Sequence, residues 1–365
     1  MSEKLSELMV RICRTIQADI PLGYDRGVIS RIRRMAEEFR IEARRLSETD
    51  WTSSQSIGRE KTQSYDKPSC NVVINVRNPT FTTDYATNRE VAFRQCRHPA
   101  FDGSPVREQV RQGSINDCGI VATIGAVAGH RPDAIRKAIF DRGDGTYDVT
   151  LHELEAVTQP HMVGKPTGNT TTFRVSSDLP YFLDTPHERP AGVWSSTCTW
   201  PALIEKAIAS EDQAWDKAAH MRWNQRWIEK YSGIDDLHTL YEIQPSPPLG
   251  YNRLGVGSMP SDRASVLARI TGEEAEVRYP PNEHAPLLSE FKRQLDSDKP
   301  VLVGTYEQTR RDIRPFGIYP GHNYEVVRVL GDKLELRNPW GFDHPEPMSV
   351  STFLTHYKRL YVTLK

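Results

Sequence analysis

Hydrophobic positions recur at helical spacing along much of the front of the chain. Residues 3–18 and 26–47 carry apolar side chains every three or four positions, which predicts two amphipathic helices. Residues 117–129, DCGIVATIGAVAG, are apolar at nearly every position, as in a helix buried on all sides. We expect this helix to begin near Cys118. Further helices are predicted at residues 132–140, 150–157 and 200–230.

Short strand-like runs replace the helical pattern in the back half. NYEVVRVL (323–330) and KLELRN (333–338) flank a Gly-Asp-Lys turn, which predicts a β-hairpin. Two more runs of this kind, VLVGTY and RLYVTL, occur at 301–306 and 359–364, and NVVINV predicts a strand at 71–76. A mainly helical half followed by a mainly β half predicts an α+β fold.

Two stretches lack periodicity and indicate breaks. Residues 48–69 are polar, as in a linker, and residues 244–262 are rich in Pro and Gly. The second stretch is interpreted as a domain boundary or a surface insertion. Such an insertion would be a lid or an exosite, or else an ordinary surface loop. We therefore expect three parts: an N-terminal extension with no assigned role at 1–100, a helical part at 101–240 and a β-rich part at 241–365.

Charge and hydropathy exclude several classes of function. Lys and Arg number 47 and Asp and Glu 48, so the net charge of −1 attracts neither nucleic acid nor an anionic membrane. No apolar run approaches the roughly 18 residues that cross a bilayer, and residues 1–12 lack the features of a secretory signal. We expect a cytoplasmic protein, with export as an effector by a dedicated secretion system as the alternative.

One of the five cysteines is placed for chemistry. They are widely spaced without a Cys-x-x-Cys pair, which disfavours a disulfide framework or a zinc ribbon. Cys118 is expected at a helix N-terminus, where free N–H groups and the helix dipole stabilise a thiolate. Gln112 precedes it and can donate to an oxyanion together with the Cys118 N–H, while Asp117 supports the site. An inert cysteine in a buried helix is the alternative.

A nucleophilic cysteine needs a base, and the base needs a group that orients it. His322, preceded by Gly321, opens the first run of the predicted hairpin, and Asn338 closes the second run. Adjacent antiparallel strands would bring these two side chains together, with Trp340 covering their hydrogen bond from water. For each residue alone, a surface histidine and an Asn-Pro turn are the alternatives.

These segments resemble the calpain family of cysteine proteases. QGSINDC (112–118) is similar to the family's Gln-Gly-x-x-x-Asp-Cys segment, and GHNY and NPWG are similar to its Gly-His-x-Tyr and Asn-Pro-Trp-Gly segments. VSSDLP (175–180), TWPALIEKAIA (199–209) and FLTHYKRLYV (353–362) also match in family order, and the likeness extends over roughly residues 104–364. It implies a papain-like fold with the active site in a cleft between a helical and a β-sheet subdomain.

The resemblance also implies a Cys-His-Asn triad that hydrolyses peptide bonds. Cys118 would attack the carbonyl, His322 would take the thiol proton and pass it to the leaving amine, and Asn338 would orient His322. Gln112 would line the oxyanion hole. The protein would be an endopeptidase acting on protein substrates, as a microbial effector or toxin or as a regulatory protease.

Several positions depart from the family pattern. Gly119 stands where the family has Trp, and Asn116 stands where it has Gly. Gln109 stands where the family has an acidic calcium ligand, and the chain has neither a dense carboxylate loop in its β-rich part nor an EF-hand loop. We therefore expect no cofactor and no metal, calcium included, and residues 1–100 are the place to look for control.

Other functions remain as alternatives. A transglutaminase or deamidase would use the same triad for a different acyl transfer, and a catalytically silent binding module would keep the fold alone. A metal enzyme is disfavoured because His152, Glu153, Glu155 and His161 match no HExxH spacing. The expected partners are a protein substrate and an inhibitor, immunity or activator protein, without nucleic acid and without a membrane span.

Overall fold

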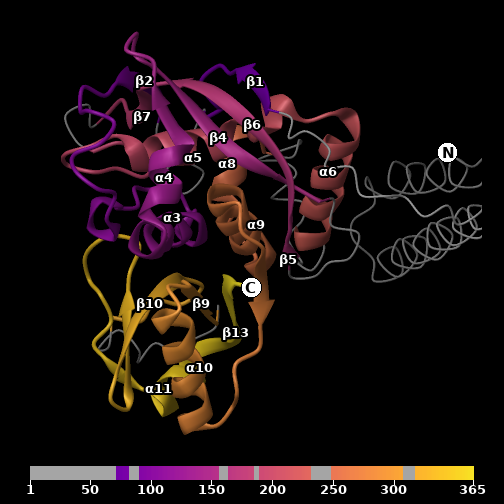
Figure 1. Ribbon diagram of the computed structural model, residues 1–365. Helices are drawn as coiled ribbons and strands as arrows, with labels where there is room; N and C mark the ends of the chain where they lie inside the picture. The colour runs from indigo at the N-terminus through magenta and orange to yellow at the C-terminus, as the bar shows by residue number, and fades with distance from the viewer. Residues whose placement is uncertain (1–70, 82–89, 156–162, 185–188, 232–247, 307–316) are drawn as a thin grey trace, which may run out of the picture. The chain divides into compact units, whose positions relative to one another are not determined.

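The computed structural model describes residues 71–81, 90–155, 163–184, 189–231, 248–306 and 317–365 (Figure 1). The chain divides into two compact units, Met1–Lys67 and Pro68–Lys365. The two predicted N-terminal helices and the linker predicted at 48–69 lie outside the described residues. Strands that precede residue 101 pair with strands further along the chain.

A four-stranded sheet in the order β1-β6-β4-β3 contains the first of these strands. β1 (Asn71–Asn75) runs parallel to β6 (Pro166–Ser176), which confirms the strand predicted at 71–76. β4 (Thr146–Leu154) runs antiparallel to β6 and to β3 (Ile139–Asp141). A separate two-stranded ribbon joins β2 (Val91–Gln95) to β7 (Asp178–Phe182).

β4 occupies the place of a predicted helix. Tyr147, Val149 and Leu151 are buried, and the residues between them are partly exposed. This alternation is typical of a half-buried strand, and its β-branched residues favour that conformation. The helix predicted at 150–157 is therefore wrong for residues 150–154, because that window begins in the middle of the strand and cuts the alternation.

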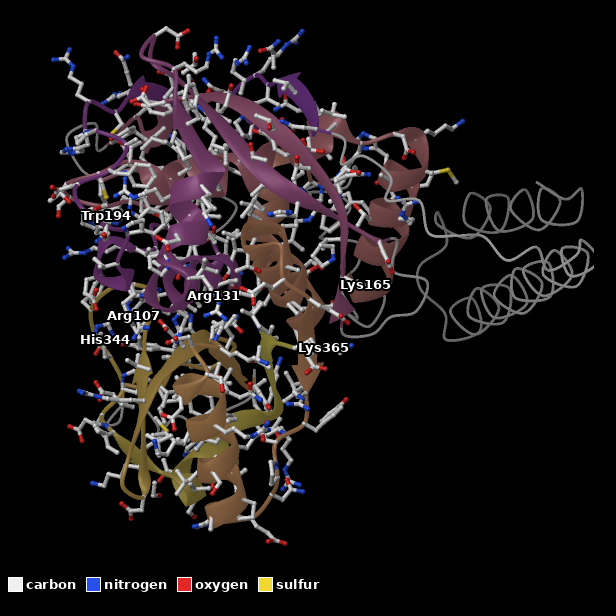
Figure 2. All side chains as sticks on the ribbon, in the orientation of Figure 1. Arg107, Arg131, Lys165, Trp194, His344 and Lys365 are labelled. Carbon is white, nitrogen blue, oxygen red and sulfur yellow. The ribbon has the colours of Figure 1, made fainter. Side chains whose placement is uncertain are left out.

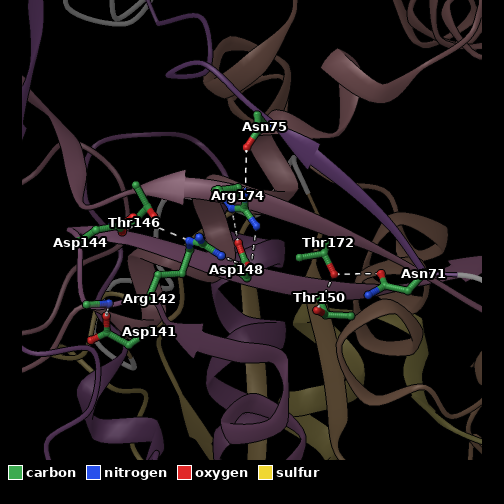
Figure 3. Close-up of polar contacts among 11 residues, drawn as sticks. Asn71, Asn75, Asp141, Arg142, Asp144, Thr146, Asp148, Thr150, Thr172 and Arg174 are labelled. Carbon is green, nitrogen blue, oxygen red and sulfur yellow. Dashed lines mark hydrogen bonds and ion pairs between the residues drawn. The ribbon is translucent and has the colours of Figure 1, made fainter.

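Polar contacts between strands attach β1 and β4 to β6 (Figure 3). Arg174 of β6 donates two hydrogen bonds, of 2.7 and 3.1 Å, to the carboxylate of Asp148 on β4. The hydroxyl of Thr172 on β6 donates to Asn71 Oδ1 at 2.9 Å and lies 2.8 Å from the hydroxyl of Thr150. Residues 71–75 thus belong to this sheet through side chains as well as backbone.

Helices gather beside this sheet and complete the first hydrophobic core (Figure 1). α3 (Cys118–His130) follows the predicted helix and is buried from Cys118 to Ala128. The helix predicted at 132–140 is present as α4 (Pro132–Ala138) and ends where β3 begins. The single helix predicted at 200–230 is divided into α5 (Trp200–Ala209) and α6 (Lys217–Tyr231) by η3 (Ser210–Ala214).

The Pro- and Gly-rich stretch is not a surface insertion over residues 248–262. α8 (Gly250–Gly255) buries Tyr251, whose N–H donates to the Thr80 carbonyl at 2.9 Å. α9 (Pro260–Thr271) follows and packs against α3 and against strands of both large sheets. Pro260 is the first residue of α9. A backbone N–H at this position makes no hydrogen bond within the helix, so proline is tolerated there. It therefore marks a helix start and not a boundary.

The back of the chain forms a seven-stranded sheet with a second hydrophobic core. Its order is β12-β11-β10-β9-β13-β8-β5, and α10 (His284–Asp296) and α11 (Val350–His356) pack on its strands. The four predicted strands and the predicted hairpin are confirmed. The seven strands of the sheet are β5 (Val163–Gly164), β8 (Ala275–Arg278), β9 (Val301–Thr305), β10 (Asn323–Leu330), β11 (Lys333–Arg337), β12 (Met348–Ser349) and β13 (Tyr357–Leu364).

The fold is therefore a mixed α+β fold, as predicted, but the part predicted to be helical at 101–240 contains a sheet of its own. The parallel pairing of β1 with the distant β6 gives no local signal in the sequence. No helix in the described part of the chain is long and apolar enough to cross a membrane.

Phe291 of α10 lies inside the second core and allows a test of its packing. Its ring is fully buried and makes T-shaped contacts with Phe353 and Tyr361, with ring centroids 5.7 and 5.2 Å away. Phe291→Ala is expected to lower the free energy of unfolding by about 3–5 kcal/mol, because truncation leaves a cavity. Urea unfolding would measure this loss. Phe140→Ala is the control, since Phe140 is 65% exposed, and equal losses for both variants would contradict the packing.

Candidate active site

The hairpin of β10 and β11 places His322 beside Asn338. Glu325 pairs with Arg337 across the two strands, so the residues just before β10 and just after β11 meet at one end of the hairpin. His322 Nε2 lies 2.9 Å from Asn338 Oδ1, and both side chains are buried. The structure thus brings together the two side chains that the sequence paired.

Hydrogen bonds determine which way the Asn338 amide points. Its Oδ1 accepts from the Trp340 N–H at 3.1 Å, and its Nδ2 donates to the Asp343 carbonyl at 3.1 Å. A backbone N–H cannot accept and a carbonyl cannot donate, so Oδ1 faces His322 and the histidine Nε2 carries a hydrogen. The lone pair of the neutral ring is then on Nδ1, which makes no hydrogen bond within the described residues. A base for a thiol needs this tautomer.

Aromatic side chains enclose the His322 imidazole. Its ring centroid lies 4.9 Å from those of Trp340 and Tyr324 and 6.1 Å from that of Tyr319. Burial lowers the pKa of His322 below its usual value, and the bond to Asn338 opposes this shift. Trp340 therefore lies beside the histidine and the asparagine, where the sequence analysis expected a cover for their hydrogen bond.

The chain before His322 turns sharply to present the ring. Gly321 has a φ of 61°, a left-handed conformation that is strained for residues with a Cβ, and its N–H donates to the Tyr306 carbonyl at 3.0 Å. The N–H of His322 donates to Thr305 Oγ1 at 2.9 Å, and this hydroxyl donates to the Tyr319 carbonyl at 2.7 Å. These bonds hold the backbone of His322 against β9.

Cys118 is the first residue of α3. The N–H groups of Ile120 and Val121 donate to the Asp117 carbonyl at 2.8 and 3.1 Å, and the Asp117 side chain does not cap the helix. Within the described residues, the N–H groups of Cys118 and Gly119 have no acceptor. Two free N–H groups at a helix N-terminus beside a thiol can bind a developing oxyanion.

The packing of α3 against β10 brings Cys118 to the residue that follows His322. Cys118 Sγ accepts a hydrogen bond from Asn323 Nδ2 at 3.2 Å. No hydrogen bond joins Cys118 to His322 in the described part of the chain, and such bonds often form only when substrate binds. Burial raises the pKa of the thiol, and the Asn323 N–H opposes that shift. A sulfur that accepts from Asn323 still has its own proton free for a base.

Gln112 lies near the start of α3 but uses its amide within the protein. Nε2 donates to the Ile115 carbonyl at 2.8 Å and lies 3.4 Å from Asp117 Oδ1, while Oε1 is buried without a partner. Both N–H groups therefore hold the loop that leads into α3. The part in an oxyanion hole that the sequence analysis assigned to Gln112 stays a prediction.

Two hydrogen bonds join the segment before α3 to the hairpin of β10 and β11. Arg337 of β11 donates to the carbonyl of Arg107 at 2.6 Å, at the start of η2 (Arg107–Gln109), and the Gln112 N–H donates to the Pro339 carbonyl at 2.9 Å. Arg107, labelled in Figure 2, also pairs with the buried Glu325 at 3.1 Å. His344, labelled in the same figure, accepts from the Asn338 N–H at 3.1 Å.

The two departures at the start of α3 have different surroundings. A Cβ on Gly119 would lie 1.9 Å from Ser258 Oγ and 3.1 Å from Arg263 Cδ, so no larger side chain fits there. The tryptophan that the calpain family has at this position cannot be placed without moving the residues that lead into α9. Asn116, in contrast, is exposed.

Two buried carboxyl groups lie behind the nucleophile. Asp117 and Glu205 of α5 face each other, and Glu205 Oε1 also accepts from the Val193 N–H at 2.8 Å. Burial raises the pKa of Asp117 to about 7 and raises the pKa of Glu205 well above its usual value. These raised pKa values favour protonation of the pair near neutral pH, and a single proton held between the two carboxyl groups is the arrangement that we expect.

Gln109 has a structural role at the position where calpains have an acidic ligand. Its Oε1 accepts from Trp200 Nε1 at 2.8 Å and from the Val106 N–H at 3.1 Å, and its Nε2 donates to the Asp102 carbonyl at 3.0 Å. Among the described residues, no group of three or more His, Cys, Asp or Glu side chains is arranged to hold a metal ion.

Comparison with known proteins adds no relative: no protein-family model matches the chain, and no curated protein matches it. The site is therefore defined by its own geometry.

Four side chains of the site were not predicted from the sequence. Asn323 is next to the predicted base, but nothing in its neighbourhood shows that it faces a helix 205 positions away. Arg263 and Ser258 lie in or beside the stretch that was interpreted as a boundary. Glu205 belongs to a segment whose likeness to calpains was noted, without a role for the carboxylate.

Asp117→Asn tests the shared proton. Because folding raises the pKa of Asp117 from 3.8 to about 7, the native protein holds a proton that the unfolded chain releases, and stability falls as pH rises through this window. An amide can donate to Glu205 and accept from Gln112 without a titrating proton. Between pH 5 and pH 7, the free energy of unfolding of the wild type is expected to fall. The corresponding fall in the variant is expected to be smaller by about 2 kcal/mol.

Urea unfolding of both proteins at several pH values would measure this difference, and the lowered pKa of His322 affects both equally. Asp296→Asn is the control, because that carboxylate is exposed on α10. Parallel pH dependences for wild type and Asp117→Asn would show that the carboxyl pair does not share a proton.

Proposed function

We propose that the chain is a cysteine endopeptidase in which Cys118, His322 and Asn338 act as a papain-like triad. The observation that carries the proposal is the 2.9 Å contact between His322 Nε2 and Asn338 Oδ1, on a segment whose next residue, Asn323, binds the Cys118 sulfur. A surface histidine and an ordinary Asn-Pro turn do not explain a buried, oriented imidazole whose neighbour in the chain binds a thiol at a helix N-terminus.

Each step of peptide hydrolysis has a group in this arrangement. The Cys118 proton passes to His322 Nδ1, and the thiolate adds to the peptide carbonyl to form a tetrahedral oxyanion. The N–H groups of Cys118 and Gly119 are placed to stabilise this oxyanion. The imidazolium then gives the proton to the departing amine and leaves a thioester, which a water activated by His322 hydrolyses. Asn338 keeps Nε2–H oriented throughout.

The architecture also supports a papain-like fold. α3, with the nucleophile at its start, packs on an antiparallel hairpin that carries the base and its orienting residue. Helix and hairpin come from opposite ends of the described chain, as expected for a site between two subdomains. Residues 71–100 and the four-stranded sheet would be additions to that fold.

The small exposure of the triad favours an extended chain as substrate. Cys118 is 5% exposed and His322 is 7% exposed, so the rigid surface of a folded protein does not reach them. An unfolded segment or a loop that enters the site residue by residue can do so. We therefore propose restricted cleavage of flexible protein segments.

Labelling with an epoxysuccinyl probe for thiol proteases tests the nucleophile. Wild type is expected to be labelled at Cys118, Cys118→Ala is expected to lose the label, and Cys198→Ala is expected to keep it because Cys198 is a second buried thiol outside the site. Mass spectrometry of the labelled peptides would identify the residue. Labelling that persists in Cys118→Ala would contradict the proposal, and an unlabelled wild type would indicate a silent binding module.

The same experiment addresses calcium and the reaction type. We expect equal labelling in EDTA and in calcium, since the acidic ligand position holds Gln109, and calcium-dependent labelling would overturn that expectation. Incubation with unfolded proteins should then generate new N-termini. Deamidated glutamines or cross-links without new N-termini would indicate acyl transfer other than proteolysis.

Asn338→Ala tests the orienting hydrogen bond. Without Oδ1, the imidazole is free to rotate and to adopt the other tautomer, so we expect the rate of probe labelling to fall by about 10²-fold with the protein still folded. Asn75→Ala is the matched control, because Asn75 bonds only the exposed side of Arg174. Unchanged labelling in Asn338→Ala would remove the asparagine from the mechanism.

A further inference from the structure

Cys118 has a polar partner besides the predicted base. Side chains of β10 alternate between its two faces: Asn323 contacts Cys118, Tyr324 packs in the second core, and Glu325 pairs with Arg107. Asn323 and Glu325 therefore face α3 and η2. The calpain-like triad uses neither of them.

The orientation of the Asn323 amide is determined by Arg263. Arg263 Nη1 donates to Asn323 Oδ1, and a guanidinium has no acceptor, so the amide oxygen must face the arginine. The Asn323 N–H then points at Cys118 Sγ, 3.2 Å away. A thiolate accepts such a bond more strongly than a thiol does, because the bond becomes charge-assisted.

Arg263 is a buried cation that forms no short ion pair among the described residues, although the carboxylate of Asp262, its neighbour in the chain, favours its charged form. It lies on α9 with 3% of its surface exposed, and its Nε and Nη2 have no hydrogen-bond partner. No carboxylate in the described part of the chain lies within ion-pair distance of its guanidinium. Burial lowers its pKa only to about 10, so it remains charged at neutral pH. An unpaired buried charge is costly unless an anion forms beside it.

Other ionisable groups face the thiol from each packed element. Asp117 at the start of α3 opposes a negative sulfur, although sharing its proton with Glu205 of α5 reduces its charge. His322 immediately precedes Asn323 in the chain, and Tyr324 of β10 stays neutral because burial raises its pKa. Asp262 of α9 acts on Arg263 and so opposes part of its effect on the sulfur. Arg263 of α9 is the one permanently charged cation that the described residues place near the sulfur, through Asn323.

We infer that Arg263 and Asn323 are positioning residues that stabilise the Cys118 thiolate in addition to His322. The thiol proton goes to His322 or to water, while the Asn323 N–H stays on the sulfur and no other bond changes. A thioester sulfur accepts hydrogen bonds poorly, so the pair also favours expulsion of the thiolate during deacylation. The catalytic use of this thiolate rests on the proposed function, but its stabilisation by Arg263 does not.

The pH dependence of Cys118 alkylation by iodoacetamide tests this inference on the full chain. Mass spectrometry would follow the Cys118 peptide, and the fitted midpoint would report the thiol pKa while the plateau rate reports access. Arg263→Gln is expected to raise the midpoint by about one unit, so that alkylation near pH 6 slows about tenfold. Arg263→Lys, which keeps the charge, should lie between this variant and wild type.

Asn323→Asp is the second variant, because a carboxylate of the same shape can still pair with Arg263 and preserve the fold. It places a negative charge against the sulfur and is expected to raise the midpoint further than Arg263→Gln. Arg269→Gln is the control: Arg269 is also on α9 but pairs with Glu211 at 3.1 Å, away from the thiol. It should leave the midpoint unchanged.

Midpoints of Arg263→Gln and Asn323→Asp equal to wild type would overturn the inference. If Arg263→Gln does not fold, Asn323→Asp and Arg263→Lys decide the outcome. A raised midpoint in a protein that cleaves nothing would leave the inference standing and remove the proposed function. Cleavage activity with unchanged midpoints would overturn the inference and leave the proposed function standing.

Discussion

The packing of α3 against β10 is the contact on which the candidate site depends. It joins Cys118 to Asn323 across 205 positions of sequence, and it sets the thiol beside the segment that carries His322. Gly119 makes the approach close: a Cβ there would lie 3.2 Å from Asn323 Nδ2 of β10 and 1.9 Å from Ser258 Oγ. A Cβ on Gly125 would lie 2.9 Å from Arg337 Nη1 of β11. A larger side chain at position 119 would press against Asn323 and Ser258 and disturb this contact.

Buried polar groups around this contact lower stability in return for a defined geometry. Asp117, Glu205 and Arg263 are all buried, and the first two hold a proton against their ordinary acidity. Burial of apolar residues at these positions would cost less free energy. The groups instead hold the start of α3 and the sulfur of Cys118 in hydrogen-bonded positions, which suits a site that must direct a proton and a negative charge.

The structural elements around the candidate site that the sequence predicted correctly are local. The hairpin of β10 and β11 follows from two alternating runs and a glycine turn, and it alone puts His322 beside Asn338. The start of α3 at Cys118 follows from an apolar run after Asp117. The errors lie elsewhere: the helix predicted at 150–157 begins in the middle of β4 and cuts its alternation, and the prolines and glycines before α9 were interpreted as a boundary.

The sequence by itself determined the periods of the main elements, the α+β class and the order of candidate nucleophile, base and orienting residue, because each depends on neighbours a few positions away. The tertiary structure decided which elements touch. Only the fold shows that Asn323 faces Cys118, that Arg263 stands behind Asn323, and that Asp117 meets Glu205. These contacts join distant segments, and their energies come from burial and charge pairing that no local pattern records.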